Sequence, residues 1–177
     1  MAVNEERQPQ QPPPTAPPDF QAVVASTSTR LYRLAARVLG SEADAEDVLQ
    51  DAYLRAFEAW RGGGFDARSS IDTWLYRIVI RVAVNFLRTR RRSDAREAAA
   101  PAAGSNAQRA LEARAELAEL SKWLDLLPPD QRAALVLKEL EGLSSADVAQ
   151  VLECSVGAVE QRLFRARATL RKRSDHE

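Results

Sequence analysis

Apolar residues recur every three or four positions along most of the chain, a spacing that predicts amphipathic helices. The first such segment begins at Asp19 and ends at Gly40, a residue type that commonly terminates helices. Ser41 followed by Asp44 resembles a capping box, which predicts that a second helix follows directly. The inward positions expected for these two helices are Leu31, Leu34, Ala35, Val38, Leu39, Val48, Leu49, Ala52, Ala56 and Trp60.

A glycine-rich break and a long apolar stripe follow. Gly62–Gly64 would cost too much backbone entropy inside a helix, so a loop is expected there. Ser70 can cap a third helix that continues up to an arginine run ending at Arg92. Its expected apolar stripe is Ile71, Trp74, Leu75, Ile78, Val82 and Phe86. The three helices are predicted to form a first domain over residues 19–92.

The next segment changes in composition. Residues 93–106 are rich in alanine and interrupted by Pro101 and Gly104, which predicts a flexible linker. Leucines at helical spacing then run to Pro128, which ends a fourth helix, and a fifth helix is expected to stop near Gly142. Residues 107–177 are therefore assigned to a second domain.

The end of the second domain has the pattern of a helix-turn-helix. Ser144 with Asp147 forms a second capping box, and after a three-residue turn Ser155 can cap a last helix. The expected contact between the two helices pairs Ala149 with Val159. Glu153 stands in the turn, where a glycine is common because the backbone there is left-handed.

Composition supports a helical class, since 45% of residues are hydrophobic but only 6% are aromatic. Residues 1–18 are rich in proline and glutamine and are predicted to be a disordered tail. The sequence thus predicts an all-α protein with two small helical domains joined by a flexible linker, the second containing a helix-turn-helix.

Charge is segregated along the chain, although the formal net charge is zero. Acids gather on the second helix, whereas the segment from Ile71 to Arg92 carries six arginines against one acid. The segment from Ser155 to Arg173 carries six bases against one acid. Two basic segments in one helical protein indicate contact with nucleic acid.

Both basic segments offer candidate contact residues. On the third helix, Arg77, Arg81, Asn85 and Arg88 recur on one face and could follow phosphates, with Phe65, Trp74 and Tyr76 nearby. The alternatives are a solvated face for the arginines and a core position for Phe65 and Trp74. On the last helix the outward residues are Gly157, Ala158, Gln161, Arg162, Arg165 and Arg167, which suit a major groove. A solvated basic helix, or a motif used only for packing, is the alternative there.

The sequence lacks the residues that several other functions require. Cys154 is the single cysteine and is expected to act as a small apolar residue without a basic partner, and the single histidine is His176. No metal-ligand set, cofactor motif or nucleophile with its base is found, so the chain is not expected to be an enzyme. Neither a signal peptide nor an apolar run of membrane-spanning length is found, which predicts a cytoplasmic protein without membrane insertion.

Four motifs in this order resemble the extracytoplasmic-function (ECF) type of bacterial RNA polymerase sigma factor, of the sigma-70 class, over residues 19–173. The motifs are Ala45–Asp51, Thr73–Ile78, Leu127–Arg132 and Ser155–Val159. The resemblance implies that residues 19–92 are sigma region 2 and residues 107–177 are sigma region 4. The family usually has Asn where Arg81 stands, Thr where Ala158 stands and a basic residue where Glu160 stands, so promoter sequence does not transfer.

The resemblance also implies partners and sites. Core RNA polymerase would be contacted through its β′ clamp coiled coil by Asp44, Glu46, Asp47, Gln50, Asp51 and Arg55, and through its β subunit. The −10 promoter element would be read and melted by Phe65, Trp74, Tyr76, Arg77, Arg81, Asn85 and Arg88. The −35 element would be read by Ser155, Val156, Gly157, Ala158, Gln161, Arg162, Arg165 and Arg167. An anti-sigma factor is a further expected partner.

Two other functions remain as alternatives to the sigma factor. A self-contained helix-turn-helix repressor would normally dimerise to read paired half-sites. A nucleic-acid-processing enzyme is the weaker alternative, because the sequence offers no catalytic residues for it.

Overall fold

The computed structural model describes residues 19–65, 69–97 and 122–174. The elements in these ranges are α1 (Phe20–Leu39), α2 (Glu42–Arg61), α3 (Ile71–Glu97), α5 (Pro129–Leu135), the π-helical segment η1 (Val136–Leu140), α6 (Ser145–Val151) and α7 (Val156–Ser174). The described part of the chain contains no strand, which confirms the predicted all-α class. The expected N-terminal tail, most of the expected linker and the first part of the expected fourth helix lie outside the described residues.

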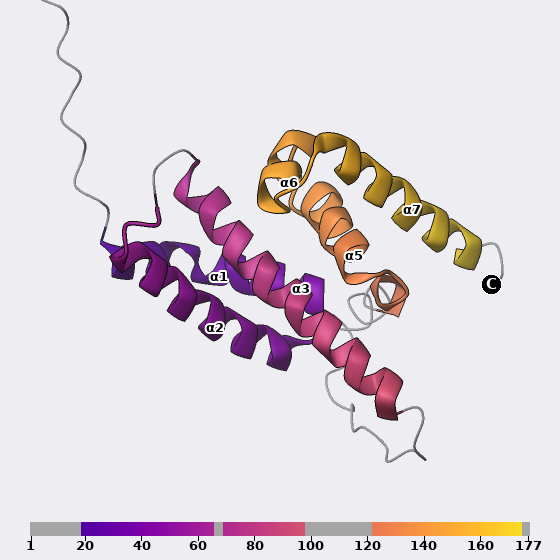
Figure 1. The fold of residues 1–177 in the computed structure, drawn as a ribbon, viewed down its shortest axis with the longest axis horizontal. Helices are drawn as coiled ribbons and strands as arrows, with labels where there is room; N and C mark the ends of the chain where they lie inside the picture. The colour runs from indigo at the N-terminus through magenta and orange to yellow at the C-terminus, as the bar shows by residue number, and fades with distance from the viewer. Residues whose placement is uncertain (1–18, 66–68, 98–121, 175–177) are drawn as a thin grey trace, which may run out of the picture.

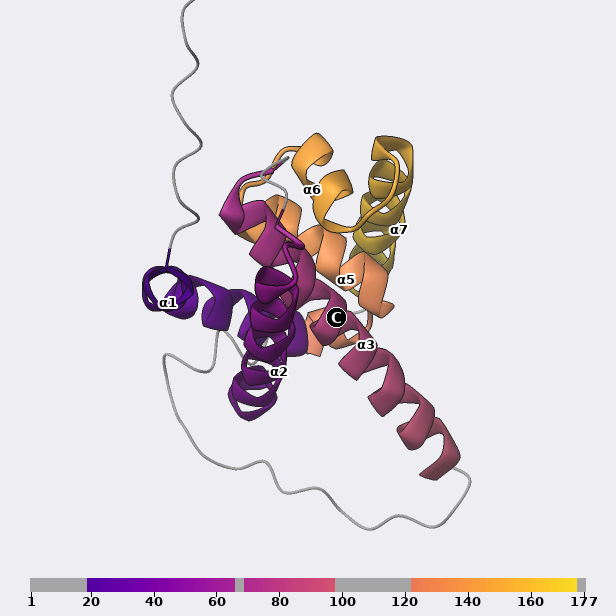
Figure 2. The same ribbon diagram turned by 60° about the vertical axis from the view of Figure 1, so that its left-hand side comes forward.

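The helices form two groups, with α3 between them (Figures 1 and 2). On one side, α1 and α2 pack against each other and against α3. On the other side, α5 and α6 contact both α7 and α3. The C-terminal turns of α3 extend beyond both groups (Figure 2). The third helix therefore belongs to the first domain and is also the surface on which the second domain rests.

The helix boundaries follow the capping residues that the sequence predicts. Gly40 adopts a left-handed conformation with φ of 68° and ends α1. Ser41 accepts a hydrogen bond from the backbone of Asp44 at 3.2 Å, and Ser70 accepts one from Thr73 at 3.1 Å. These three predictions of helix ends are confirmed.

The end of α3 differs from the prediction. The helix continues to Glu97, so residues 93–97, which were assigned to the linker, are helical. The reason is local, because residues 92–97 contain arginine, alanine and glutamate, which favour helices, and neither glycine nor proline.

A second buried stripe on α3 was not predicted. Beyond the expected apolar positions, α3 buries Tyr76, Val79, Ile80, Ala83, Val84 and Leu87. Ile80 and Val84 line a crevice together with Val151 and Leu152 of the second domain. A helix that packs on more than one side is apolar over more of its circumference, which was the signal available in the sequence.

The second domain contains a buried arginine. Arg132 is 1% exposed, and its guanidinium donates to the carboxylate of Asp125 at 2.5 Å. Burial lowers the pKa of Arg132, and the hydrogen bond to Asp125 opposes this shift. After η1, the chain turns at Gly142, which has φ of 70°. The expected end of the fifth helix is therefore confirmed.

The helix-turn-helix is formed as predicted. Ser144 and Asp147 make a complete capping box at the start of α6. Ala149 and Val159 are both buried. In the turn, Glu153 adopts φ of 49°, the only positive φ of a non-glycine residue among those described.

Candidate nucleic-acid and protein interfaces

The acidic surface of α2 is partly paired and partly free for a partner. Glu46, Asp47 and Gln50 are exposed. Asp44 instead pairs with Arg90 of α3 at 2.8 Å. Asp51 accepts from Arg55 of the next turn at 2.9 Å, and this hydrogen bond raises the pKa of Arg55. The helix thus carries an exposed acidic patch next to two ion pairs, one within α2 and one to α3.

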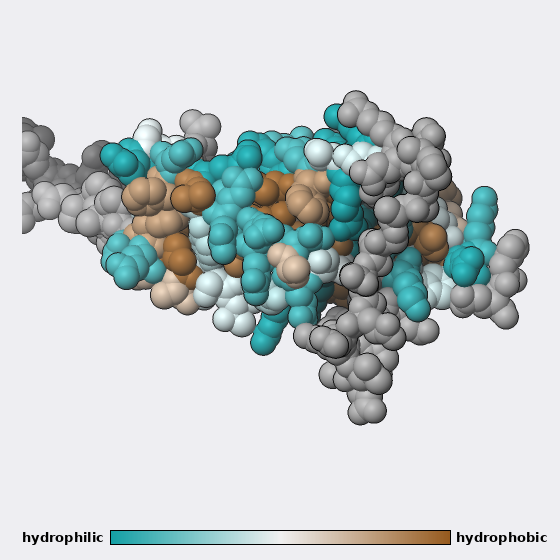
Figure 3. Space-filling model, turned by 90° about the horizontal axis from the view of Figure 1, so that it is seen from below, coloured by the Kyte–Doolittle hydropathy of each residue, from teal (hydrophilic) through white to brown (hydrophobic). Residues whose placement is uncertain are grey.

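Two apolar side chains extend this acidic patch along α2. Leu54 is 65% exposed and Phe57 is 43% exposed. Figure 3 shows hydrophobic residues exposed between hydrophilic ones on the face of the molecule seen from below. Neither residue was predicted as a contact, although both fall outside the inward positions of the helix and could have been found on that basis. An acidic surface with exposed apolar residues at its end suits a protein partner.

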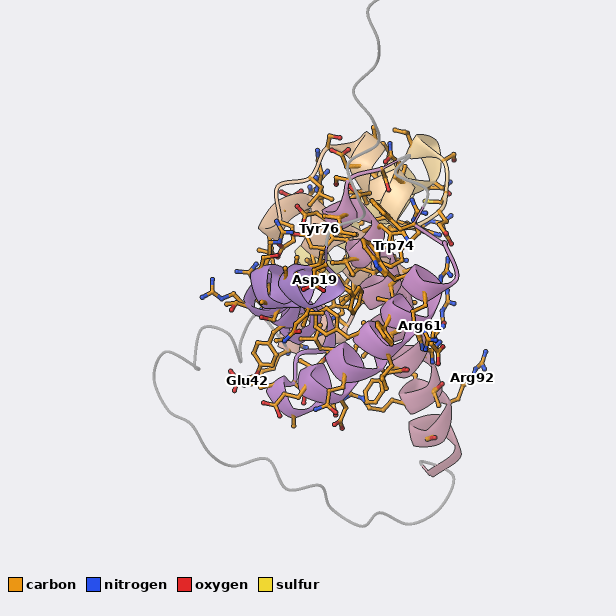
Figure 4. All side chains as sticks on the ribbon, turned by 90° about the vertical axis from the view of Figure 1, so that its left-hand side faces the viewer. Asp19, Glu42, Arg61, Trp74, Tyr76 and Arg92 are labelled. Atoms are coloured by element: carbon orange, nitrogen blue, oxygen red, sulfur yellow. The ribbon has the colours of Figure 1, made fainter. Side chains whose placement is uncertain are left out.

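Aromatic side chains pack against one another at one end of the first domain. Trp60 stacks on Phe65 at a centroid distance of 5.4 Å, and Phe65 meets the edge of Trp74 at 5.5 Å. Trp74 is 7% exposed, so the core alternative holds for it in this structure. Tyr76 is also buried, its hydroxyl donates to Glu141 at 3.4 Å, and burial raises the pKa of its phenol. Figure 4 shows both among the helices, whereas Arg92 extends away from them.

The polar stripe of α3 faces the second domain. Arg81 forms an ion pair with Glu153, and Arg77 Nε lies 3.8 Å from the same carboxylate. Arg88 pairs with Asp130 at 2.8 Å, whereas Asn85 is exposed and lines the crevice between the domains. The stripe is therefore neither a fully solvated face nor free to receive nucleic acid in this arrangement.

The outward face of α7 is more open. Ser155, Val156, Gly157, Gln161, Arg165 and Arg167 are exposed or nearly so, and Ala158 is half-buried. Ser155 Oγ accepts from the backbone of Ala158 at 3.2 Å and so caps the helix as predicted. Arg167 pairs with Glu139 of the same domain at 2.5 Å.

Arg162 departs from the predicted outward face. It is half-buried and lines the crevice toward α3. Its guanidinium donates to Cys154 Sγ at 3.2 Å. The expectation that Cys154 has no basic partner is therefore wrong, because eight residues later the helix returns the side chain to the turn.

These surfaces define a class of helical protein with a helix-turn-helix, an exposed acidic face and two basic faces. Residues 23–93 match the family model of sigma-70 region 2, and residues 117–170 match that of sigma-70 region 4. No helix among the described residues is long and apolar enough to cross a membrane.

The chain is similar in sequence to characterised sigma factors. The chain is 38% identical to the RNA polymerase sigma-H factor of Pseudomonas aeruginosa, covering 86% of this chain and 84% of that protein. It is 32% identical to the ECF RNA polymerase sigma-E factor of Escherichia coli K12, covering 85% and 84%. The chain belongs to the ECF sigma factors of the sigma-70 family, whose members direct promoter-specific transcription initiation and are not catalytic enzymes.

Two solved structures share the fold. The sigma factor RpoE in complex with the anti-sigma factor NepR, from Bartonella quintana, has a TM-score of 0.67 and 25% identity, covering 87% of this chain and 95% of that one. CnrH in complex with the cytosolic domain of CnrY has a TM-score of 0.66 and 31% identity, covering 89% and 88%.

Proposed function

We propose that this chain binds core RNA polymerase and recognises a promoter through two separate DNA-reading surfaces, melting the −10 element. The observation that carries the proposal is the open outward face of α7 in a formed helix-turn-helix, where Gln161 and Arg165 lie one helical turn apart and both are exposed. The family membership supplies the polymerase as the partner.

The α2 surface would dock on the β′ clamp coiled coil. Glu46, Asp47 and Gln50 are exposed and can contact a partner without rearrangement of the fold. Leu54 and Phe57 add apolar area beside them. Asp44, Asp51 and Arg55 already have partners, so they would contribute by exchanging those ion pairs for contacts with the polymerase. The second domain would contact the β subunit.

The first domain would read and melt the −10 element. Arg77, Arg81, Asn85 and Arg88 line one face of α3 and can follow the phosphates of a separated strand. Extruding a base from its stack costs a few kcal/mol, which contacts in a protein pocket offset. Phe65, which is only partly buried, can contribute such contacts, whereas Trp74 and Tyr76 would hold the frame of the site.

The second domain would read the −35 element as a duplex. The residue proposed to read a base is Gln161, whose side-chain amide can pair with adenine through two hydrogen bonds. Ser155, Val156, Gly157 and Ala158 lie at the start of α7 and can approach the groove closely, with Arg162, Arg165 and Arg167 further along the helix.

An anti-sigma factor is proposed as the regulating partner, in the cytoplasm. The two similar solved structures are complexes of sigma factors with such proteins. The acidic and apolar surface of α2 and the crevice between the domains are the surfaces that it could cover.

The test combines co-purification with transcription. The full chain is mixed with core polymerase, promoters are selected from a randomised DNA library, and run-off transcripts are measured on the selected templates. The proposal expects stable co-purification and transcripts that depend on the chain. A chain that ignores the polymerase but binds a palindromic duplex as a dimer would instead identify a repressor.

A further inference from the structure

Four ion pairs between the two domains have the same polarity. Each joins an arginine of the first domain to an acid of the second: Arg81 and Arg77 to Glu153, Arg88 to Asp130, and Arg37 to Glu141 at 2.5 Å. Three of these arginines belong to the polar stripe of α3 that is proposed to contact DNA. The acids that pair with them therefore lie where phosphates would bind.

Glu153 holds its position at a conformational cost. It adopts φ of 49°, a region that a side chain with a Cβ disfavours and that glycine occupies freely. A glycine would serve the turn between α6 and α7 at least as well. Strain of this kind points to a role for the side chain itself, and its carboxylate is the group that meets Arg81 and Arg77.

We propose that Asp130 and Glu153, here called the latch acids, hold the free chain closed by occupying the arginines of the α3 stripe. The inference rests on the proposed function in one respect, namely that this stripe is the surface for the −10 strand. In the closed state the second domain partly covers that surface and pairs with its arginines, and the chain must open before it can bind a promoter through both domains.

The ion pairs made by the latch acids are exposed enough to be broken. The Arg81 and Glu153 side chains are 56% and 50% exposed, and those of Arg88 and Asp130 are 48% and 36% exposed. Exposed ion pairs of this kind are individually weak and are screened by salt. A crevice of about 200 Å³ between the domains is lined by the paired side chains of Arg81, Arg88, Asp130 and Glu153, so solutes can reach these ion pairs. Phosphates or a polymerase surface can therefore compete with the latch acids.

Domain closure is measured by fluorescence energy transfer between one dye on each domain, in the full chain without DNA. Dyes are attached at Arg33→Cys on α1 and Lys172→Cys on α7, both exposed positions, in a Cys154→Ser background. The test variant combines Glu153→Gly with Asp130→Asn. Glycine relieves the strained backbone, so loss of closure cannot be attributed to a damaged turn. The control is Glu139→Gln, which removes an acid whose partner, Arg167, lies in the same domain.

The latch predicts that the closed fraction of the parent chain is high at low salt and falls several-fold at 1 M salt, where the Debye length is about 3 Å. Because the Arg37–Glu141 pair remains, the test variant should keep a smaller closed fraction than the parent at low salt, and the Glu139→Gln control should behave as the parent does. Equal transfer in the parent and the test variant, or no response to salt, overturns the latch.

Adding core polymerase separates the latch from the proposed function. Polymerase that opens the parent chain supports both. If the test variant opens but polymerase neither binds nor changes the transfer, the latch stands and the assignment as a polymerase subunit fails.

Discussion

The two surfaces proposed to read DNA differ in how available they are. On α7, Gln161 and Arg165 are exposed and have no side-chain partner among the described residues. On α3, Arg81 and Arg88 are engaged by acids from the other domain. A basic stripe in the sequence therefore indicates a candidate binding surface, but it does not indicate whether that surface is free.

The contrast has a structural origin. The face of α7 belongs to a motif whose geometry is fixed by local contacts, namely the caps at Ser144 and Ser155 and the packing of Ala149 and Val159. The face of α3 lies on a helix that packs on two sides, so its availability depends on where a separate group of helices rests.

Leu163→Ala should have the strongest effect, because it removes most of a side chain that is 1% exposed in the core of the second domain. The loss of packing should cost about 2–5 kcal/mol. Hydrogen exchange should then show unprotected amides in α6 and α7 while α1 and α2 stay protected. Binding to the −35 duplex should fall and binding to the −10 strand should persist. Equal loss of protection in both domains would show that they unfold as one unit.

Replacing Asp47 and Gln50 together by alanine should weaken polymerase binding by about 1–3 kcal/mol, because truncating central contact residues has costs of this size. Both side chains are exposed, so circular dichroism and melting temperature should not change. Affinity is measured by titration against core polymerase, with Glu160→Ala in the other domain as the control. Unchanged affinity with a native spectrum would remove α2 from the polymerase interface.

Gln161→Ala and Arg165→Ala should produce defects of different kinds on the −35 duplex. Loss of the Gln161 amide should relax base preference at one position, at a cost of about 1–3 kcal/mol. Loss of Arg165 should weaken all sequences together and reduce the salt slope by about one unit, as expected for a phosphate contact. Binding is measured over a library of −35 sequences at two salt concentrations. If neither variant changes the profile, α7 does not read DNA.

The smallest effect is expected from the helix caps, which exist in both domains. Ser144→Ala removes a complete capping box and Ser41→Ala removes a single cap, and each should cost about 1 kcal/mol. Chemical denaturation measures the change in unfolding free energy, and Ser144→Thr is the control that keeps the hydroxyl. A loss equal to that of Leu163→Ala would mean that Ser144 does more than cap α6.

Much of the fold follows from local sequence signals. The ends at Gly40 and Gly142 and the turn around Glu153 are set by residues within a few positions of each, so the sequence predicts them. The helical residues 93–97 and the second buried stripe of α3 were missed for different reasons. The helical residues 93–97 could have been predicted from the helix propensity of that segment, which its alanine-rich composition obscured. The second buried stripe depends on contact with residues far away in the sequence, such as Val151 and Leu152.

The candidate surfaces likewise combine features that local sequence predicts with features that depend on distant residues. The exposure of Asp47, Gln50, Gln161 and Arg165 follows from helical periodicity and was predictable. The partners of Arg81 and Arg88 come from another domain, and no local pattern indicates them. Arg162 was misassigned because its contact with Cys154 depends on how the turn folds back.

The most direct test of the difference between the two surfaces is fluorescence anisotropy of the free chain on two probes, the −10 strand and the −35 duplex of a promoter selected with polymerase. The variant carrying Glu153→Gly and Asp130→Asn is compared with the parent at low salt. If about nine in ten molecules are closed, opening should tighten binding to the −10 strand about tenfold, since apparent affinity scales with the competent fraction. Affinity for the −35 duplex should change far less. Equal gains on both probes, or none on the −10 strand, would contradict the account.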